Sequence, residues 1–207
     1  AVTQAAKLLR EGELVAIPTE TVYGLAANAL DPDAVAKIFK AKGRPQDNPL
    51  IVHISSLEEL PPLVTEIPDR ARKLAEAFWP GPLTMVLPRS SRVPDVVTAG
   101  LETVAIRMPS HSVARAVIQV SGLPIAAPSA NLSGKPSPTS ARHCMEDLTG
   151  KIPLVLDGGP CQVGVESTVV TLTGDIPRLL RPGAVKAEQL REVLGLIEVD
   201  PAVLEKA

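Results

Sequence analysis

The sequence predicts an α/β domain built on a mixed sheet that helices cover. Short apolar runs of strand length alternate with amphipathic segments of helix length along the 207-residue chain. The runs 83–87 and 103–107 are joined without a clear crossover helix, and 168–172 and 179–181 form a hairpin-like pair. We therefore expect antiparallel pairs among parallel ones. With 45% apolar residues, the chain can bury a substantial core as one large domain or two small ones.

Amphipathic spacing and end signals together indicate the helices. The second helix has the clearest start, because Asp31 stands at the cap position and Pro32 follows it. The fifth is expected to begin at Pro138, with Ser137 as its cap. The expected helices are 2–10, 31–40, 68–78, 112–120, 138–148 and 187–194.

The expected strands are short, mostly apolar runs that proline, glycine or charged residues interrupt. They are 14–17, 50–54, 83–87, 103–107, 124–127, 154–157, 168–172 and 179–181.

Composition excludes several functional classes. The 21 basic and 23 acidic residues nearly balance, which argues against a dedicated nucleic-acid binder. Aromatic residues make up only 2%, too few for an extended base-stacking platform. No apolar run approaches the ~18 residues of a membrane span. Cys144 and Cys161 fit neither a redox motif nor a zinc site, so we expect reduced thiols in a cytoplasmic protein.

Polar side chains gather at the expected ends of several strands, where open α/β sheets usually bind ligands. If the segment 18–25 is extended, Thr19, Thr21 and Tyr23 share one face. A threonine-rich turn explains the same residues without a ligand, and both interpretations stay open.

Basic residues accompany these polar segments. Lys42 and Arg44 flank a glycine, where they can bind one anion or form a solvated helix end. Arg107 ends an apolar strand and needs a partner, either a substrate carboxylate or an internal acid. His53 lies within a strand, where a structural role competes with substrate positioning.

The segment 126–139 carries a strand into a hydroxyl-rich loop and then into a helix. The free N–H groups of that helix start favour a phosphate, although simple capping explains the loop equally well. The segments 164–168 and 180–183 again place hydroxyls and a basic residue at strand ends. Together these segments predict one concave site suited to a small zwitterion and a polyphosphate. The chain has no P-loop, dinucleotide-binding, nucleophile-elbow or HExxH motif.

In combination, these segments resemble the YrdC-like family. The matching motifs are PTETVYGL at 18–25, KGRP at 42–45, NPLIVHI at 48–54, WPGPLT at 79–84, TVAIRMP at 103–109, PIAAPSANLSGKPSPT at 124–139, DGG at 157–159, GVEST at 164–168 and LLRPG at 179–183. The family signature, Lys-x-Arg followed downstream by Ser-x-Asn, is present as Lys42/Arg44 and Ser129/Asn131.

The resemblance implies a twisted open mixed sheet, flanked by helices, with a large central cavity. It implies a single catalytic domain over 1–207, with a core match over about 12–183 and no second C-terminal domain. The implied reaction joins L-threonine, bicarbonate and ATP, with Mg²⁺, into threonylcarbamoyl-AMP and pyrophosphate. This nucleotidyl transfer would be the first step of tRNA threonylcarbamoyladenosine modification next to the anticodon. A separate threonylcarbamoyl transferase complex would act downstream.

The resemblance also implies residue roles. Lys42 and Arg44 are expected to be catalytic. The implied threonine site is Thr21, His53, Arg107, Ala127 and Ser167, and the implied ATP site is Arg44, Asn48, Thr103, Ser129, Asn131, Ser137 and Arg181. No metal ligand is assigned. The alternatives are a double-stranded RNA-binding module, or a carbamoyl-adenylate-forming domain of the hydrogenase-maturation type; weak RNA binding by the enzyme also stays open.

Overall fold

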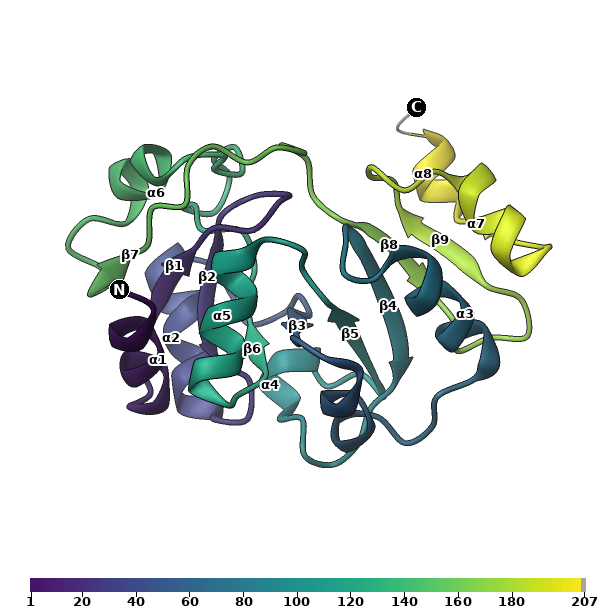
Figure 1. Ribbon diagram of the computed structural model, residues 1–207, viewed down its shortest axis with the longest axis horizontal. Helices are drawn as coiled ribbons and strands as arrows, with labels where there is room; N and C mark the ends of the chain where they lie inside the picture. The colour runs from purple at the N-terminus through teal and green to yellow at the C-terminus, as the bar shows by residue number, and fades with distance from the viewer. Residues whose placement is uncertain (206–207) are drawn as a thin grey trace.

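The computed structural model describes residues 1–205 and is built around one open sheet of ten strands (Figure 1). The strands are β1 Val15–Ile17, β2 Gly24–Asn28, β3 Ile51–His53, β4 Leu83–Pro88, β5 Thr103–Arg107, β6 Ile125–Ala126, β7 Leu154–Val155, β8 Thr168–Thr171, β9 Arg178–Arg181 and β10 Glu198–Val199. Their order across the sheet is β10-β9-β8-β4-β5-β3-β6-β2-β1-β7. Residues 206–207 of the expected domain lie outside the described residues.

The sheet contains both strand directions, as the sequence predicts. β4 and β5 pair antiparallel, and so do β8 and β9, with a register shift between Val169 and Val170. β3 with β5 and β4 with β8 are parallel pairs. The fold class is therefore confirmed. Within the described part of the chain, no helix has the length and apolar character needed to cross a membrane.

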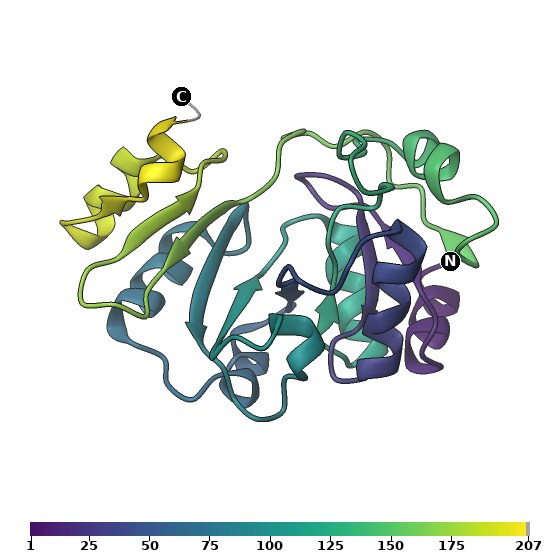
Figure 2. The same cartoon turned by 180° about the vertical axis from the view of Figure 1, so that it is seen from behind.

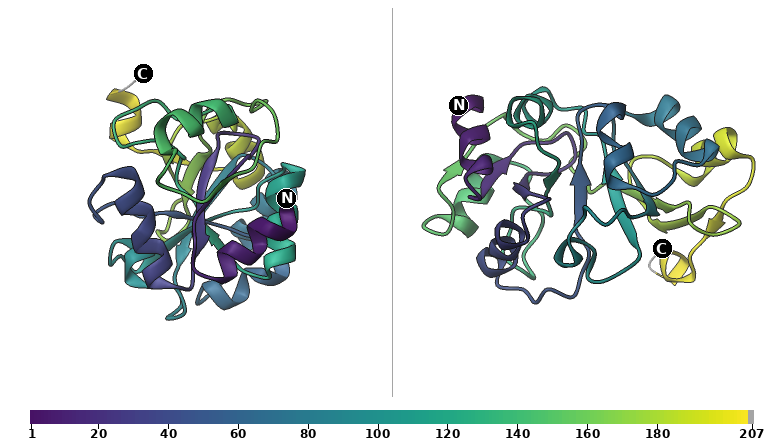
Figure 3. Two further views of the ribbon diagram at one scale, coloured as in Figure 1. Left: turned by 90° about the vertical axis from the view of Figure 1, so that its left-hand side faces the viewer. Right: turned by 90° about the horizontal axis from the view of Figure 1, so that it is seen from below.

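Helices lie on both sides of this sheet (Figures 1 and 2). They are α1 Val2–Arg10, α2 Pro32–Lys42, α3 Asp69–Phe78, α4 Asp95–Thr98, α5 Ser112–Ser121, α6 Ala141–Leu148, α7 Ala187–Leu194 and α8 Pro201–Glu205, with 3₁₀ turns at Leu57–Glu59 and Pro61–Leu63. α1 and α5 pack together on one face near β1 and β2, and α2 lies on the opposite face (Figure 3).

Two apolar clusters follow from the alternation of side chains along the strands. Val15 and Ile17 pack with Leu9 of α1 and Val117 of α5 in the smaller cluster. The intervening Ala16 belongs to the larger cluster, which extends over the opposite face and the remaining strands.

The start of α6 differs from the prediction. The helix begins at Ala141, and its cap is Ser140, whose Oγ accepts a hydrogen bond from the amide of His143 at 3.3 Å. The carbonyl of Pro138 instead accepts a bond from the Tyr23 amide at 2.9 Å. This contact ties Pro138 to the start of β2, so the predicted cap at Ser137 and start at Pro138 are wrong.

Candidate active site

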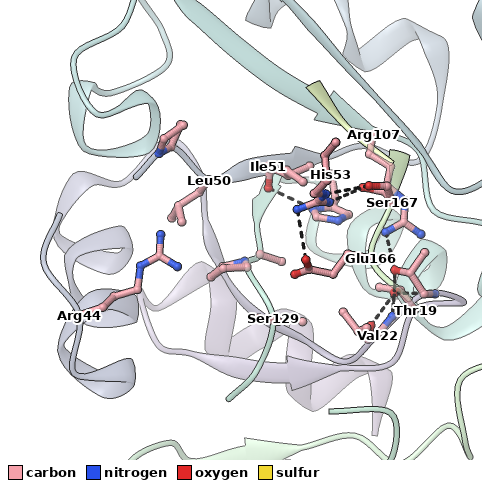
Figure 4. A pocket seen from close by; sticks show the side chains of 16 residues that line it. Thr19, Val22, Arg44, Leu50, Ile51, His53, Arg107, Ser129, Glu166 and Ser167 are labelled. Carbon is pink, nitrogen blue, oxygen red and sulfur yellow. Dashed lines mark hydrogen bonds and ion pairs between the residues drawn. The ribbon is translucent and has the colours of Figure 1, made fainter. Parts of the chain in front are cut away.

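One pocket of about 140 Å³ opens near the middle of the sheet, where several strand ends and loops meet (Figure 4). Eight residues that the sequence predicted for the site line it: Thr21, Arg44, His53, Arg107, Ala127, Ser129, Ser167 and Arg181. The remaining lining residues are Thr19, Val22, Gly24, Pro49, Leu50, Ile51, Pro128 and Glu166. The large central cavity stays a prediction.

The other predicted site residues lie outside this lining. Thr103 begins β5, at the opposite end of that strand from Arg107. Ser137 lines a separate pocket of about 460 Å³ beside α6. Asn48 lies in the exposed loop before β3, and Lys42 and Asn131 are buried. Their roles stay predictions.

The turn before β2 places two hydroxyls at the pocket. Thr19 Oγ1 donates to the carbonyl of Val22 at 2.5 Å and lies 3.0 Å from Thr21 Oγ1. Tyr23 does not share their face, because its hydroxyl donates to Gly159 O at 2.7 Å and accepts from the Gly158 amide at 3.0 Å. The segment is a turn rather than the extended chain that would align all three side chains.

Arg107 has an internal partner, Glu20, which the sequence analysis did not single out. The Arg107 guanidinium forms a buried ion pair with Glu20 Oε1, and its other bonds go to Thr21 Oγ1 at 3.0 Å and Gly81 O at 3.2 Å. Glu20 Oε2 accepts from the amide of Ser110 at 2.9 Å. Burial alone would raise the pKa of Glu20, but the Arg107 charge and the bond from Ser110 lower it. Of the two partners considered for Arg107, the structure shows the internal acid.

His53 is a neutral, buried side chain. It is 4% exposed, and burial, with the neighbouring Arg107 charge, lowers its pKa to about 3. Its Nδ1 lies 3.1 Å from Ile51 O. Because a carbonyl only accepts, Nδ1 carries the proton and Nε2 carries the lone pair. His53 is therefore suited to fixed hydrogen bonding rather than to proton exchange near neutral pH.

The pKa of His53 predicts an acid-sensitive fold. The unfolded chain binds a proton below its ordinary pKa of 6.5, whereas the folded chain does so only near 3. Stability from this group is thus complete above pH 6.5 and is lost as pH falls toward 3. We expect wild type to lose about 2–3 kcal/mol more unfolding free energy than His53→Gln between pH 7 and 4.5. Urea denaturation measures the unfolding free energy of both proteins at each pH. An equal change in the two proteins between pH 7 and 4.5 would contradict this pKa of His53.

Arg181 is held at the pocket by the residue that it faces. Its Nε donates to Ser167 O at 2.9 Å and its Nη2 donates to Ser167 Oγ at 3.0 Å. Ser167 Oγ in turn lies 2.7 Å from Thr84 Oγ1. Among residues 1–205, Glu166 forms a single longer ion pair, with its Oε2 3.4 Å from Arg181 Nη1, and its side chain is 43% exposed. An incoming anion can therefore reach Arg181 without dismantling the bonds to Ser167.

The backbone beside Arg181 needs glycine at position 183. A Cβ there would lie 2.5 Å from Thr168 N and 2.8 Å from Glu166 O. Because both contacts are backbone atoms, Gly183→Ala must displace the segment that carries Ser167. We expect a loss of about 1–3 kcal/mol in unfolding free energy.

A matched control for this change is Gly174→Ala, whose Cβ would lie 3.8 Å from its nearest neighbour, Ile176 O. Urea denaturation should leave this variant near wild type. Equal midpoints for the two variants would refute the close-packing argument.

Arg44 reaches the pocket from the loop that follows α2. Gly43 ends the helix in the left-handed conformation, with φ 66°, and so redirects the chain. The Arg44 guanidinium lies 5.2 Å from the ring centroid of Phe39, and its buried Nε has no hydrogen-bond partner among the described residues. No carboxylate of the described chain forms an ion pair with Arg44, so its charge is available to a ligand anion.

Lys42 is the last residue of α2 and does not line the pocket. Its Nζ bonds to the Ser129 carbonyl, to Asn131 O at 2.9 Å and to Asn131 Oδ1 at 3.2 Å. Burial, with the neighbouring Arg44 charge, lowers its pKa to about 8. The two halves of the sequence signature therefore meet in space.

These features define a mixed α/β domain whose strand-end pocket combines cations, hydroxyls and one carboxylate. Comparison with known proteins gives the family. A family model described as "Telomere recombination" (Sua5/YciO/YrdC) matches residues 7–183. The chain is 60% identical over 203 residues to threonylcarbamoyl-AMP synthase of Pyrococcus abyssi, covering 98% of this chain and 60% of that protein. It is 58% identical over 206 residues to the Bacillus subtilis enzyme of the same name, covering 99% and 60%.

Similarity to a solved structure supports the same family. The crystal structure of P. abyssi Sua5 complexed with L-threonine matches with a TM-score of 0.97 and 59% identity, over 100% of this chain and 61% of that one. The chain belongs to the Sua5/YciO/YrdC family, as the sequence motifs predicted. It spans about three fifths of the length of these relatives.

Proposed function

We propose that this chain forms threonylcarbamoyl-AMP from L-threonine, bicarbonate and ATP, with release of pyrophosphate. The observation that carries the proposal is one pocket in which Arg44 and Arg181 accompany the hydroxyls of Thr21 and Ser167. Relatives that are 58–60% identical bear the name of this enzyme, and a relative of nearly the same fold was crystallised with L-threonine.

The first chemical step makes a carbamate. The threonine ammonium and bicarbonate combine, a C–N bond forms, and water and one proton leave. Thr21 and Ser167 offer hydroxyls to the amino acid, and Arg107, with its charge balanced by Glu20, offers remaining N–H donors to a carboxylate. Neutral His53 is suited to positioning threonine. A carbamate hydrolyses readily, so a recessed pocket that limits water protects it.

The second step is nucleotidyl transfer. A carbamate oxygen attacks the α-phosphorus, and the bond to the β-phosphate oxygen breaks to release pyrophosphate. Such a step depends mostly on alignment and on neutralising charge at the phosphates. Arg44 and Arg181 supply that positive charge from two different parts of the chain, the first from the loop after α2 and the second from β9.

The residues present fit a Mg²⁺ ion that arrives with ATP. The described residues contain no group of three or more His, Cys, Asp or Glu side chains that could hold a metal ion by itself. Among the described residues that line the pocket, Glu166 is the one carboxylate. Protein-bound Mg²⁺ commonly uses one or two carboxylates together with substrate phosphates. Glu166 would hold the ion, which when bound would neutralise phosphate charge.

The decisive experiment measures pyrophosphate release from ATP with threonine and bicarbonate both present, and with each omitted. Release that requires both supports the proposal. Release with carbamoyl phosphate instead of threonine and bicarbonate would indicate the carbamoyl-adenylate activity. If no release occurs and RNA binding falls steeply with salt, an RNA-binding module replaces the proposal. We further propose that a separate transferase uses the product to modify tRNA, because a mixed carbamic–phosphoric anhydride is an activated acyl donor.

A further inference from the structure

The contacts of Lys42 are those of a structural residue rather than those of a residue that binds a phosphate. Its side chain is 3% exposed and does not line the pocket, although Arg44, two residues later, does. A lysine ammonium has three N–H donors. All three find protein acceptors here: Ser129 O, Asn131 O and Asn131 Oδ1.

The partner loop is tied in return to the end of α2. The amide of Ser133 donates to the Lys42 carbonyl at 2.9 Å. Asn131 Nδ2 donates to the carbonyls of Leu132 at 2.9 Å and Lys135 at 2.7 Å, so the amide that accepts from Lys42 also closes its own loop. Asn131 is 6% exposed. Lys42 and Asn131 thus form one buried polar cluster.

This cluster joins the two segments that present ligand-facing groups. Ser129 lies at one end of the tied loop and lines the pocket, and Arg44 follows Lys42 directly after the turn at Gly43. A phosphate could take a hydrogen bond from Lys42 only if one of the three acceptors gave up its donor. Losing a bond to a buried acceptor carries a desolvation cost, which favours the arrangement seen.

We propose that Lys42 is a positioning residue that ties the Ser129–Asn131 loop to the end of α2 and does not bind the phosphates itself. The Lys-x-Arg and Ser-x-Asn halves of the signature then have divided roles. Lys42 and Asn131 fix the distance between two loops, and Arg44 and Ser129 face the ligand. The effect of Lys42 on ATP binding rests on the proposed function, whereas its effect on the loop does not.

The first test needs no ligand. Lys42→Met keeps the length of the side chain and removes every donor, and Lys40→Met is the matched control because Lys40 is exposed on the same helix. In the nucleotide-free protein, we expect amide hydrogen exchange of residues 129–135 to accelerate about tenfold or more in Lys42→Met. The control should leave exchange unchanged. Wild-type exchange rates in Lys42→Met would overturn the proposal.

The second test measures ATP affinity by calorimetry for Lys42→Met, Asn131→Ala and the double variant. Because both residues belong to one tie, each single change should weaken ATP binding by about tenfold and the double change should weaken it little further. Arg44→Ala should add its full effect to either change, since it acts on the ligand directly. Additive losses from Lys42→Met and Asn131→Ala, together with normal loop exchange, would show that Lys42 contacts the phosphates.

The exchange and calorimetry experiments distinguish a failure of the proposed function from a failure of the proposed role of Lys42. If wild type binds no ATP, the proposed function fails, and loop exchange still decides the role of Lys42. If Lys42→Met does not fold, Asn131→Ala is compared with Asn131→Asp, which keeps a side-chain oxygen for Lys42 and loses only the Nδ2 bonds to Leu132 and Lys135. Faster exchange of residues 129–135 in Asn131→Ala than in Asn131→Asp supports the tie, and equal exchange in the two variants overturns it.

Discussion

Replacing Arg44 by alanine is expected to lower threonine-dependent pyrophosphate release by about 10²-fold or more. Loss of one preorganised donor to a developing charge commonly has an effect of this size. Arg44 lines the pocket and has no carboxylate partner in the described chain, so its charge is free for a phosphate. Arg44→Lys should recover part of the rate, because it restores the charge without the planar fork.

Stability separates this effect from misfolding. The folded contact that Arg44 loses is its approach to the Phe39 ring, worth about 0.5–1 kcal/mol at a partly exposed site. The thermal midpoint of Arg44→Ala should therefore stay close to that of wild type. Arg92→Ala, an exposed arginine outside the pocket, is the matched control and should keep normal activity. Near-normal pyrophosphate release by Arg44→Ala, with threonine and bicarbonate saturating, would refute its role.

The strands that the sequence predicted best are those whose large apolar side chains indicate a buried position. β4 and β5 are rich in Val, Leu, Ile and Met, and they pair antiparallel as expected. The sequence showed no clear helix between them, but the connection 89–102 contains the short helix α4. β2 was missed because its sequence, GLAAN, has small residues with weak strand preference. Its place is set by pairing with β1 and β6, which local sequence does not reveal.

The start of α6 shows the same limit at a helix end. The sequence PSPTSA offers two serines that can cap a helix, Ser137 and Ser140. Local chemistry does not choose between them. A hydrogen bond from the Tyr23 amide to Pro138 O selects the later one, and this contact spans more than a hundred residues of sequence.

Within the site, ligand-facing groups were predicted and their counter-charges were not. Hydroxyls and arginines stand out at strand ends, but an acid beside them looks like an ordinary surface residue. Glu20 lies inside the motif PTETVYGL and Glu166 inside GVEST, so the signal was an acid within each hydroxyl-rich segment. The separate directions of Lys42 and Arg44 depend on the left-handed turn at Gly43. A spacing of two residues does not specify that turn.

Replacing Glu20 by alanine is expected to lower the unfolding free energy by about 3–5 kcal/mol. The change leaves Arg107 buried without its counter-charge, and breaking a buried ion pair by removing one partner commonly costs this much. The Ser110 amide also loses its acceptor. Urea denaturation at pH 7 measures the effect.

The control is Glu13→Ala, which removes an ion pair of similar composition at the surface. Glu13 Oε1 lies 3.3 Å from Lys37 Nζ, and both side chains are 45% exposed. Solvent screens this pair, so its loss should change stability by less than about 1 kcal/mol. If Glu20→Ala and Glu13→Ala are equally stable, the Glu20–Arg107 pair does not organise the pocket.

A double variant separates the structural role of this pair from its proposed role in binding. In Glu20→Gln with Arg107→Met, neither position keeps a charge, so stability should exceed that of Glu20→Ala. Threonine affinity should not recover, because Arg107 no longer presents N–H donors beside Thr21 and Ser167. Calorimetry with threonine distinguishes the two effects. A stable double variant that binds threonine normally would show that Arg107 only fills a buried position.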